Sequence, residues 1–412
     1  MLRVPIHQSR PGMILASPVQ HPERHDTVLL RQGFVLDDAA VKRLRAMALP
    51  EVWIEYPGLA FVERHINPKV TQARAEVSMM IGRVIAKIQR DAKTKLEYPA
   101  YRRTVRGLLH KIVDQPEAAQ LVQALGGGGF SMARHGADVC FLCLLMGLKL
   151  DTYLIAQRKR LPAHRAKDVV SLGLAGLLHD IGMLGLDEET RQRWRQNSDE
   201  QDEAWREHVR IGYERVQDGV DAPAASAILH HHQHYDGTGF PNVEGGLTGS
   251  GLQGQEIHVF ARILAAADMF DRFQHPADAV APEPAVRALA RMRREPFAKW
   301  IDPVVFQALL AVAPAYPPGT IVRLSSGDRC AVVAWAPGDP CRPTVAPIGE
   351  LGESWDGGGE EATHRIVLAE RRDLRIVEVD GQDVREDNFY PTYPGEFDLP
   401  WTPAGLGVPE AA

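Results

Sequence analysis

The spacing of apolar residues changes along the chain and divides it into segments of different structure. Short β-branched runs around one helix-like segment predict an α+β unit, apolar residues at helical spacing predict a long helical region, and β-branched runs between Gly and Pro turns predict a β module. The predicted segments are a small N-terminal α+β domain at 1–66, a helical linker at 67–129, an all-helical bundle at 130–314, a small C-terminal β module at 315–379 and a flexible tail at 380–412. The expected fold class is mainly α.

The predicted linker contains a long amphipathic segment from Thr71 to about Leu125, with Val77, Ile81 and Val84 on one face. An apolar helix face of this length either packs in a core or pairs with a second copy of the chain, so a homodimer is one expectation. The segment ends at Gly126–Gly129, which lacks the flanking strand and the lysine of a phosphate-binding loop. We interpret these glycines as a connecting loop.

The most informative apolar run, Leu172 to Leu178, predicts a buried helix that ends directly in His179 and Asp180. An imidazole and a carboxylate at the end of a buried helix are costly unless something pairs with them. A divalent metal pairs with both, because His nitrogen and Asp oxygen are natural ligands. The run therefore predicts a metal site.

Four further helices carry His or Asp on the face that points toward the predicted core. Each of these residues shares its face with apolar neighbours, which turns it inward. They are His135, His208, the pair His231 and His232 at the end of an apolar helix, and Asp268 in an Ala-rich helix. One such residue alone is usually a hydrogen-bonded core residue, but five helices that all behave alike indicate a common site. Helical bundles build dinuclear metal centres in this way.

Composition narrows the class of protein. The chain has 412 residues, 45% hydrophobic and 24% charged, as expected for a globular protein of two or three domains. A net charge of −6 gives no general attraction to a nucleic acid polymer. We expect a cytoplasmic protein without a membrane span, because we find neither a signal peptide nor an apolar run of spanning length. Cys140 and Cys143 lie in an apolar helix and are interpreted as reduced core residues.

With these motifs in this order, Phe130 to Val312 resembles the HD-GYP family of cyclic di-GMP phosphodiesterases, a bacterial branch of the HD metal-dependent phosphohydrolases. The loop that names the family corresponds to Gly239-Phe240-Pro241. The N-terminal unit, with Arg10-Pro11-Gly12-Met13, resembles a small domain that often precedes HD-GYP modules. The resemblance implies two divalent transition-metal ions, iron or manganese, held by His135, His179, Asp180, His208, His231, His232 and Asp268.

The resemblance also implies a reaction, the opening of cyclic di-GMP to linear pGpG and then to GMP by water activated between two metals. Asp180 would bridge the ions, and Asp271, one turn after Asp268, would hold the attacking water or accept its proton. Gly237, Gly239 and Phe240 would contact the substrate. These assignments follow from the resemblance.

The chain departs from the family pattern where that pattern binds phosphate. Met183 stands in place of a lysine, Gln233 in place of a glutamate, Phe240 in place of a tyrosine, and Ala277 follows His275-Pro276 where an Arg-Pro-Tyr stretch is common. Ser131 stands where members with a third metal have a glutamate, so no third ion is expected. The metal ligands are therefore intact while the phosphate contacts are depleted, and each lost charge-assisted hydrogen bond costs about 1.5–3 kcal/mol.

Three hypotheses follow. The first is an active cyclic di-GMP phosphodiesterase, and the second is a metal-loaded but catalytically weak module that senses the nucleotide or binds a protein through the loop Gly237–Pro241. The third keeps the metal chemistry and changes the substrate to another nucleotide or phosphate ester. If Met183 marks a missing cation, Met183→Lys should raise kcat/KM for cyclic di-GMP about tenfold.

Overall fold

The computed structural model describes residues 1–21, 27–47, 49, 51–60, 62, 68–114, 131–242, 251–277, 279, 281–349 and 364–400. Within these ranges the chain is mainly helical, as the periodicity predicts, with strands near both termini. The predicted loop Gly126–Gly129 lies outside the described residues.

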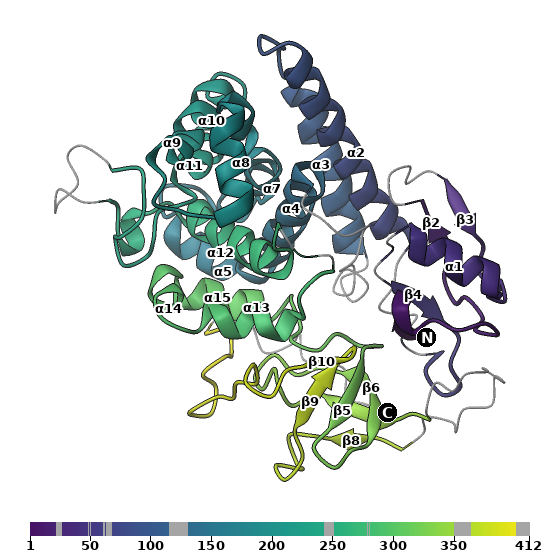
Figure 1. The fold of residues 1–412 in the computed structure, drawn as a ribbon. Coiled ribbons are helices and arrows are strands. Elements are labelled where there is room, and N and C mark those ends of the chain that lie inside the picture. Colours follow the sequence, from purple (N-terminus) through teal and green to yellow (C-terminus); the bar gives the residue numbers. More distant parts are fainter. Residues whose placement is uncertain are drawn as a thin grey trace.

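Helices make up the central body of the protein (Figure 1). The longer ones are α2 (Pro68–Arg90), α3 (Tyr98–Asp114), α4 (Met132–Lys149), α7 (Val170–Leu178), α8 (Glu188–Asn197), α10 (His208–Val216), α11 (Ala222–His230), α12 (Val259–Gln274), α13 (Ala285–Met292) and α15 (Pro303–Leu310). The shorter ones are α5 (Asp151–Gln157), α6 (Ala163–Ala166), η3 (Ile181–Gly185), α9 (Glu203–Arg206), η4 (Gly254–Glu256) and α14 (Phe297–Trp300).

The centre of the bundle is the contact between α4 and α7, both of which are almost wholly buried. Two glycines permit this close approach: a Cβ atom added to Gly136 would lie 2.9 Å from the carbonyl oxygen of Leu177, and one added to Gly176 would lie 3.0 Å from Cα of Cys140. Helix α12 packs against both helices. The three helices that carry His135, His179 and Asp268 are thereby brought together.

The apolar segment Ala163–Gly185 is long enough by length and composition to cross a membrane, although the sequence reading found no such run. In the structure 78% of its apolar window is buried inside the protein. It includes α7, the central helix of the bundle, so this burial accounts for its apolar character. The cytoplasmic location stays a prediction.

Helices α2 and α3 occupy the segment that was predicted as a linker, but they are part of the bundle. Val77, Ile81 and Val84 of α2 and Val105 and Leu108 of α3 are buried in the same core as α4 and α7. Arg74 of α2 also forms a buried ion pair with Asp138 of α4. The apolar face of the predicted amphipathic segment is thus satisfied within the chain, and pairing with a second copy is not needed to cover it.

The N-terminal unit has the expected α+β composition. Strands β1 (Leu2–Pro5) and β4 (Glu51–Ile54) pair antiparallel, β2 (Val19–Gln20) pairs with β3 (Val28–Leu30), a short η1 (Ile6–Gln8) follows β1, and α1 spans Asp38–Ala46. Helix α1 begins where Asp37 accepts a hydrogen bond from the Ala40 amide at 2.7 Å, a typical N-cap.

The C-terminal strands form a six-stranded antiparallel sheet in the order β10-β9-β5-β6-β7-β8. Its strands are β5 (Ile321–Leu324), β6 (Arg329–Ala334), β7 (Thr344–Pro347), β8 (Ile366–Val367), β9 (Ile376–Val379) and β10 (Gln382–Asp383). Side chains alternate between the two faces: Ala331 and Val333 pack with the N-terminal unit, whereas Cys330 and Val332 pack in the core of the bundle. The sheet therefore joins the N-terminal unit to the helices (Figure 1).

The predicted flexible tail is wrong for residues 380–400. Gln382 and Asp383 form an edge strand, and Val384 and Phe397 are buried at 1% and 3% exposure. Buried apolar side chains offset the Pro and Gly content that led to the prediction. Residues 401–412 lie outside the described part of the chain.

Candidate metal centre

The predicted ligands converge at one place in the bundle. His135 lies in the first turn of α4, His179 and Asp180 follow the last residue of α7, His208 begins α10, His231 and His232 follow α11, and Asp268 lies in the middle of α12. All six of the side chains other than Asp180 are buried. The turn after α7 is fixed by its packing on α10, since a Cβ atom on Gly182 would lie 1.9 Å from the carbonyl oxygen of His208.

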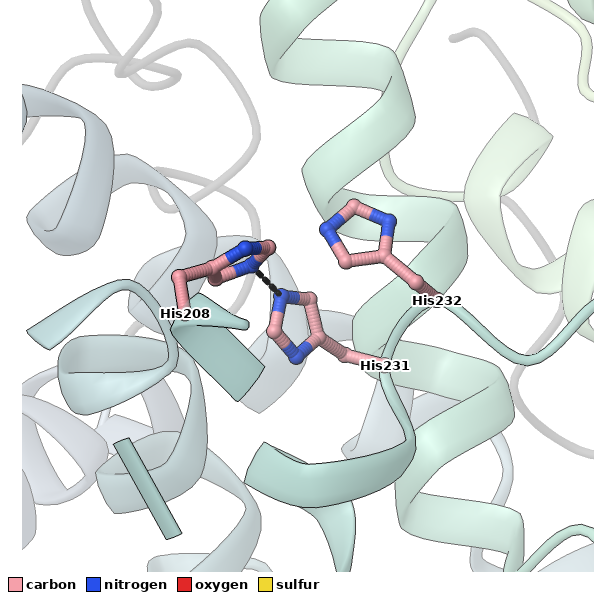
Figure 2. A group of neighbouring side chains, drawn as sticks. All are labelled: His208, His231 and His232. Carbon is pink, nitrogen blue, oxygen red and sulfur yellow. Dashed lines mark hydrogen bonds between the residues drawn. The ribbon is translucent and has the colours of Figure 1, made fainter. Parts of the chain in front are cut away.

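The donor atoms form two groups of three. His135, His179 and Asp180 bring one ligand atom each within 4.8 Å of one another, and so do His208, His231 and His232. Figure 2 shows the second group, in which the ring of His208 approaches that of His231. Each group offers the nitrogen and oxygen atoms that divalent transition metals prefer.

Asp180 lies between the two groups. Its Oδ2 is 3.7 Å from Nε2 of His135 and 3.6 Å from Nε2 of His179, whereas its Oδ1 is 3.7 Å from Nε2 of His208 and 3.9 Å from Nε2 of His231. Ligand bonds of about 2.0–2.2 Å place donor atoms on one ion roughly 3–4 Å apart. The two oxygens of one carboxylate therefore face two separate cation positions.

The hydrogen bonds of the histidines show that the site fits cations. In three of the histidines, Nδ1 faces a backbone carbonyl oxygen, which can only accept a hydrogen bond. The pairs are His179 with Gly176 at 2.9 Å, His208 with Trp205 at 2.7 Å and His231 with Ile228 at 2.7 Å. In a neutral ring Nδ1 therefore carries the proton, and Nε2 has a free lone pair. Nε2 of His208 lies 3.4 Å from Nε2 of His231, so two lone pairs face each other. A bound cation removes that repulsion.

Burial and nearby charges act in opposite directions on the protonation of these rings. Burial disfavours the charged form of His135, but hydrogen bonds to Asp268 and Asp271 outweigh it and raise the pKa of His135 to about 10. Burial lowers the pKa of His231 to about 3, and it also lowers the pKa of His208. The second group is therefore neutral near pH 7, whereas an ion bound by the first group would have to displace a proton from His135.

Asp271 lies behind His135 rather than beside the free ligand atoms. Its Oδ2 is 2.7 Å from Nδ1 of His135, and its Oδ1 is 3.0 Å from Nδ1 of His275. A carboxylate on the outer nitrogen of a ligand histidine fixes the orientation of its ring. Both oxygens of Asp271 face imidazole rings in this structure, and its predicted contact with the attacking water stays a prediction. Asp138, Asp271 and His275 also bring three donor atoms together, but Arg74 and Arg134 neutralise Asp138.

Of the three residues predicted to contact substrate, Phe240 lies in an apolar cluster together with Met183, whereas Gly237 and Gly239 lie in the loop that leads to Phe240. Phe240 and Met183 are each 6% exposed and pack with Trp205, Leu186 and Val209. Gly239 closes the loop tightly, since a Cβ atom there would lie 2.2 Å from the carbonyl oxygen of His232, and Gly237 has a φ of +85°. In this structure Gly237 and Gly239 shape the loop and Phe240 packs against the ring of His232, and the contacts of these three residues with substrate stay a prediction.

The sequence reading missed two charged residues beside the centre. Nε of Arg272 lies 2.9 Å from Oδ2 of Asp268, and its Nη1 donates to Oε1 of Glu200 at 2.8 Å. Arg272 could have been found, because it lies four residues after Asp268 on one helix face. Glu200 lies in a polar segment between α8 and α9 that has no periodic signal. Ser131, by contrast, serves as the N-cap of α4.

Comparisons with known proteins show what this chain is similar to. A family model described as HD domain matches residues 152–305. A cyclic di-GMP phosphodiesterase, PA4108 of Pseudomonas aeruginosa, is 28% identical over 358 residues, which cover 79% of this chain and 80% of that protein. The 3'3'-cGAMP-specific phosphodiesterase 3 of Vibrio cholerae is 33% identical over 146 residues, which cover 34% of this chain and 29% of that protein. The solved structure of Bd1817, an HDG"Y"P protein from Bdellovibrio bacteriovorus, is similar with a TM-score of 0.41 and 15% identity over 75% of this chain and 97% of that one.

The helical bundle, the matched HD domain and the His-Asp centre define an HD-domain protein with a candidate metal centre. The matched HD domain, and the similarity to a cyclic di-GMP phosphodiesterase over 79% of the chain, agree with the predicted resemblance to the HD-GYP family.

Proposed function

We propose that this protein is a metal-dependent phosphodiesterase that hydrolyses cyclic di-GMP to linear pGpG and then to GMP. The observation that carries the proposal is the position of Asp180, whose two oxygens face two separate groups of histidines. Similarity to a cyclic di-GMP phosphodiesterase over 79% of the chain supports the choice of substrate.

Seven side chains would hold the ions. His135, His179 and Asp268 would serve one ion, His208, His231 and His232 the other, and Asp180 would bridge them. Two bound ions, iron or manganese, supply a nucleophilic hydroxide near neutral pH and polarise the phosphodiester.

The protein's own groups prepare the site for that chemistry. Backbone carbonyls and Asp271 hold the outer nitrogens of the histidines, so that the inner nitrogens converge without reorganisation. Arg272 fixes the orientation of the Asp268 carboxylate, and Asp271 fixes that of the His135 ring. The apolar cluster around Trp205 limits the access of water on one side.

A second candidate substrate is a related cyclic dinucleotide, and the relative named as specific for 3'3'-cGAMP favours it. The buried positions of Met183 and Phe240 favour a third candidate, a metal-loaded module of low turnover. All three candidates share the ligand set and differ in the measured rate and substrate.

Metal analysis beside a hydrolysis assay separates these candidates. Protein purified without oxygen should hold about two transition-metal ions per chain and convert cyclic di-GMP faster than 3'3'-cGAMP. Asp180→Ala should lose most of the metal and the activity, whereas Asp373→Ala, a change at an exposed aspartate in the C-terminal region, should keep both. Wild-type protein with two ions and no cyclic di-GMP hydrolysis would overturn the proposal. Preference for 3'3'-cGAMP would select the second candidate.

A further inference from the structure

Three charged side chains remain partly open to solvent at the metal centre. The side chains of Asp180, Arg272 and Glu200 are 19%, 19% and 18% exposed, whereas those of His135 and Asp268 are 1% and 3% exposed. These three residues therefore mark the side from which an anionic ligand reaches the candidate ions. Arg272 is the cation among them.

The guanidinium group of Arg272 forms ion pairs with two carboxylates, of which only the one to Glu200 is also a hydrogen bond. Its Nε lies 2.9 Å from Oδ2 of Asp268, and its Nη1 donates to Oε1 of Glu200 at 2.8 Å. Glu200 is itself placed by His234, whose Nε2 lies 3.8 Å from the second carboxylate oxygen. Among the residues that the structure describes, none provides a hydrogen-bond acceptor for Nη2 of Arg272. One N–H edge of a fixed cation is thus left for a ligand.

The surrounding charges keep this cation in its charged form. Burial disfavours the charge on Arg272, but Asp268 and Glu200 outweigh burial and raise its pKa above the ordinary value. A guanidinium suits a phosphate better than an ammonium does, because its planar fork donates several hydrogen bonds in fixed directions. Its position beside Asp268 keeps it within reach of a phosphate at the candidate metal centre.

The apolar cluster around Trp205 also favours Arg272, because its side chains offer no alternative contact for a phosphate. Met183 and Phe240 are packed against Trp205, so neither side chain presents a polar group to a ligand in this structure. Arg206 lies over the Phe240 ring, 4.9 Å from its centroid, and donates to the carbonyl oxygen of Glu200. Unlike Arg272, Arg206 forms no hydrogen bond or ion pair with a candidate metal ligand in the described part of the chain.

We propose that Arg272 binds a phosphate oxygen of the cyclic dinucleotide through Nη2 and so acts as a substrate-binding residue of this centre. The inference rests on the proposed function and names the residue that contacts the substrate's charge. If Arg272 served only to balance the charge of Asp268 and Glu200, its removal would change metal content and stability but not ligand affinity.

The test measures binding of a hydrolysis-resistant phosphorothioate analogue of cyclic di-GMP to the full-length, metal-loaded protein by calorimetry at several salt concentrations. Arg272→Gln should weaken binding roughly ten- to hundredfold and flatten the salt dependence, because one charge-assisted contact is lost. Arg210→Gln is the matched control. Arg210 also lies between two carboxylates, Glu207 and Glu214, but its side chain is 55% exposed on α10. Its removal should leave affinity unchanged.

Metal content of each variant is measured in parallel. If Arg272→Gln loses metal or fails to fold, Arg272→Lys replaces it, since lysine keeps a cation between Asp268 and Glu200 and loses the second NH2 group. Arg272→Lys should retain metal and bind several-fold more weakly. Unchanged affinity in a metal-loaded Arg272 variant would overturn the inference while the hydrolysis of cyclic di-GMP by the wild type still stands. Absence of hydrolysis in the wild type would instead count against the proposed function.

Discussion

The rings of Phe240 and His232 stack, with centroids 4.7 Å apart and planes inclined by 13°. Phe240, the central residue of the loop Gly239-Phe240-Pro241, thus supports a candidate metal ligand. Trp205 packs against both rings and against His208, so three aromatic contacts orient two ligands of the second group. Packing of this aromatic cluster therefore sets the orientation of two candidate ligands.

Phe240→Leu should weaken metal binding at the second group by up to about tenfold, because the ring that orients His232 is lost. Stability should fall by about 1 kcal/mol as the stack is removed. Metal titration and thermal unfolding measure the two effects. Phe273→Leu is the control, since Phe273 makes an edge-to-face contact with Phe297 rather than with a candidate ligand. Equal metal affinity in both variants would show that the stack has no role in metal binding.

Met183→Lys should not raise kcat/KM, contrary to the expectation from the sequence. Met183 is 6% exposed in an apolar cluster, so an ammonium group there would be desolvated. We expect a loss of about 2–3 kcal/mol in the free energy of unfolding, measured by urea titration. Met183→Leu, which keeps the volume and the apolar character, should cost less than about 1.5 kcal/mol. A stable, metal-loaded Met183→Lys protein with tenfold higher kcat/KM would restore the sequence-based interpretation.

Asp271→Ala should reduce metal affinity about ten- to hundredfold, because its carboxylate orients His135. His275→Ala should cause a smaller loss, since it removes only the second contact of Asp271. Metal titration, followed by kinetics at saturating metal, distinguishes this supporting role of Asp271 from a role as proton acceptor. If Asp271 were instead the proton acceptor, metal affinity would stay unchanged and kcat would fall about 10²–10⁴-fold. The exposed Asp218→Ala variant provides the baseline.

His258 should make stability depend on pH in the acidic range. Burial lowers the pKa of His258 to about 4, so the folded state keeps the ring neutral while the unfolded chain takes up a proton below about pH 6.5. Its contribution is therefore present above pH 6.5 and is lost as pH falls toward 4. His258→Asn should remove about 1–3 kcal/mol of the stability difference between pH 7.5 and pH 4. Urea titrations at both pH values measure it, with the exposed His110→Asn as control. Equal pH dependence in wild type and His258→Asn would contradict the prediction.

The sequence determined the helical class of the protein and indicated the residues of its candidate metal centre. The run Leu172–Leu178 could only be a buried element, and His179 and Asp180 at its end required partners. Helical periodicity also placed His135, His208 and Asp268 on inward faces, because the face of a residue is a local property. Motifs in order along the chain then indicated the family.

The tertiary structure decided what those residues contact. Periodicity gives the face of a helix but not its neighbour, so the sequence did not show that Asp180 lies between two groups of histidines or that Asp271 supports His135. The tertiary structure likewise decided that α2 and α3 lie in the core and that residues 380–400 pack on the protein. Both features depend on apolar surfaces brought together from distant parts of the chain. The same long-range packing buries Met183 beside Phe240 and leaves the Arg272 side chain 19% exposed.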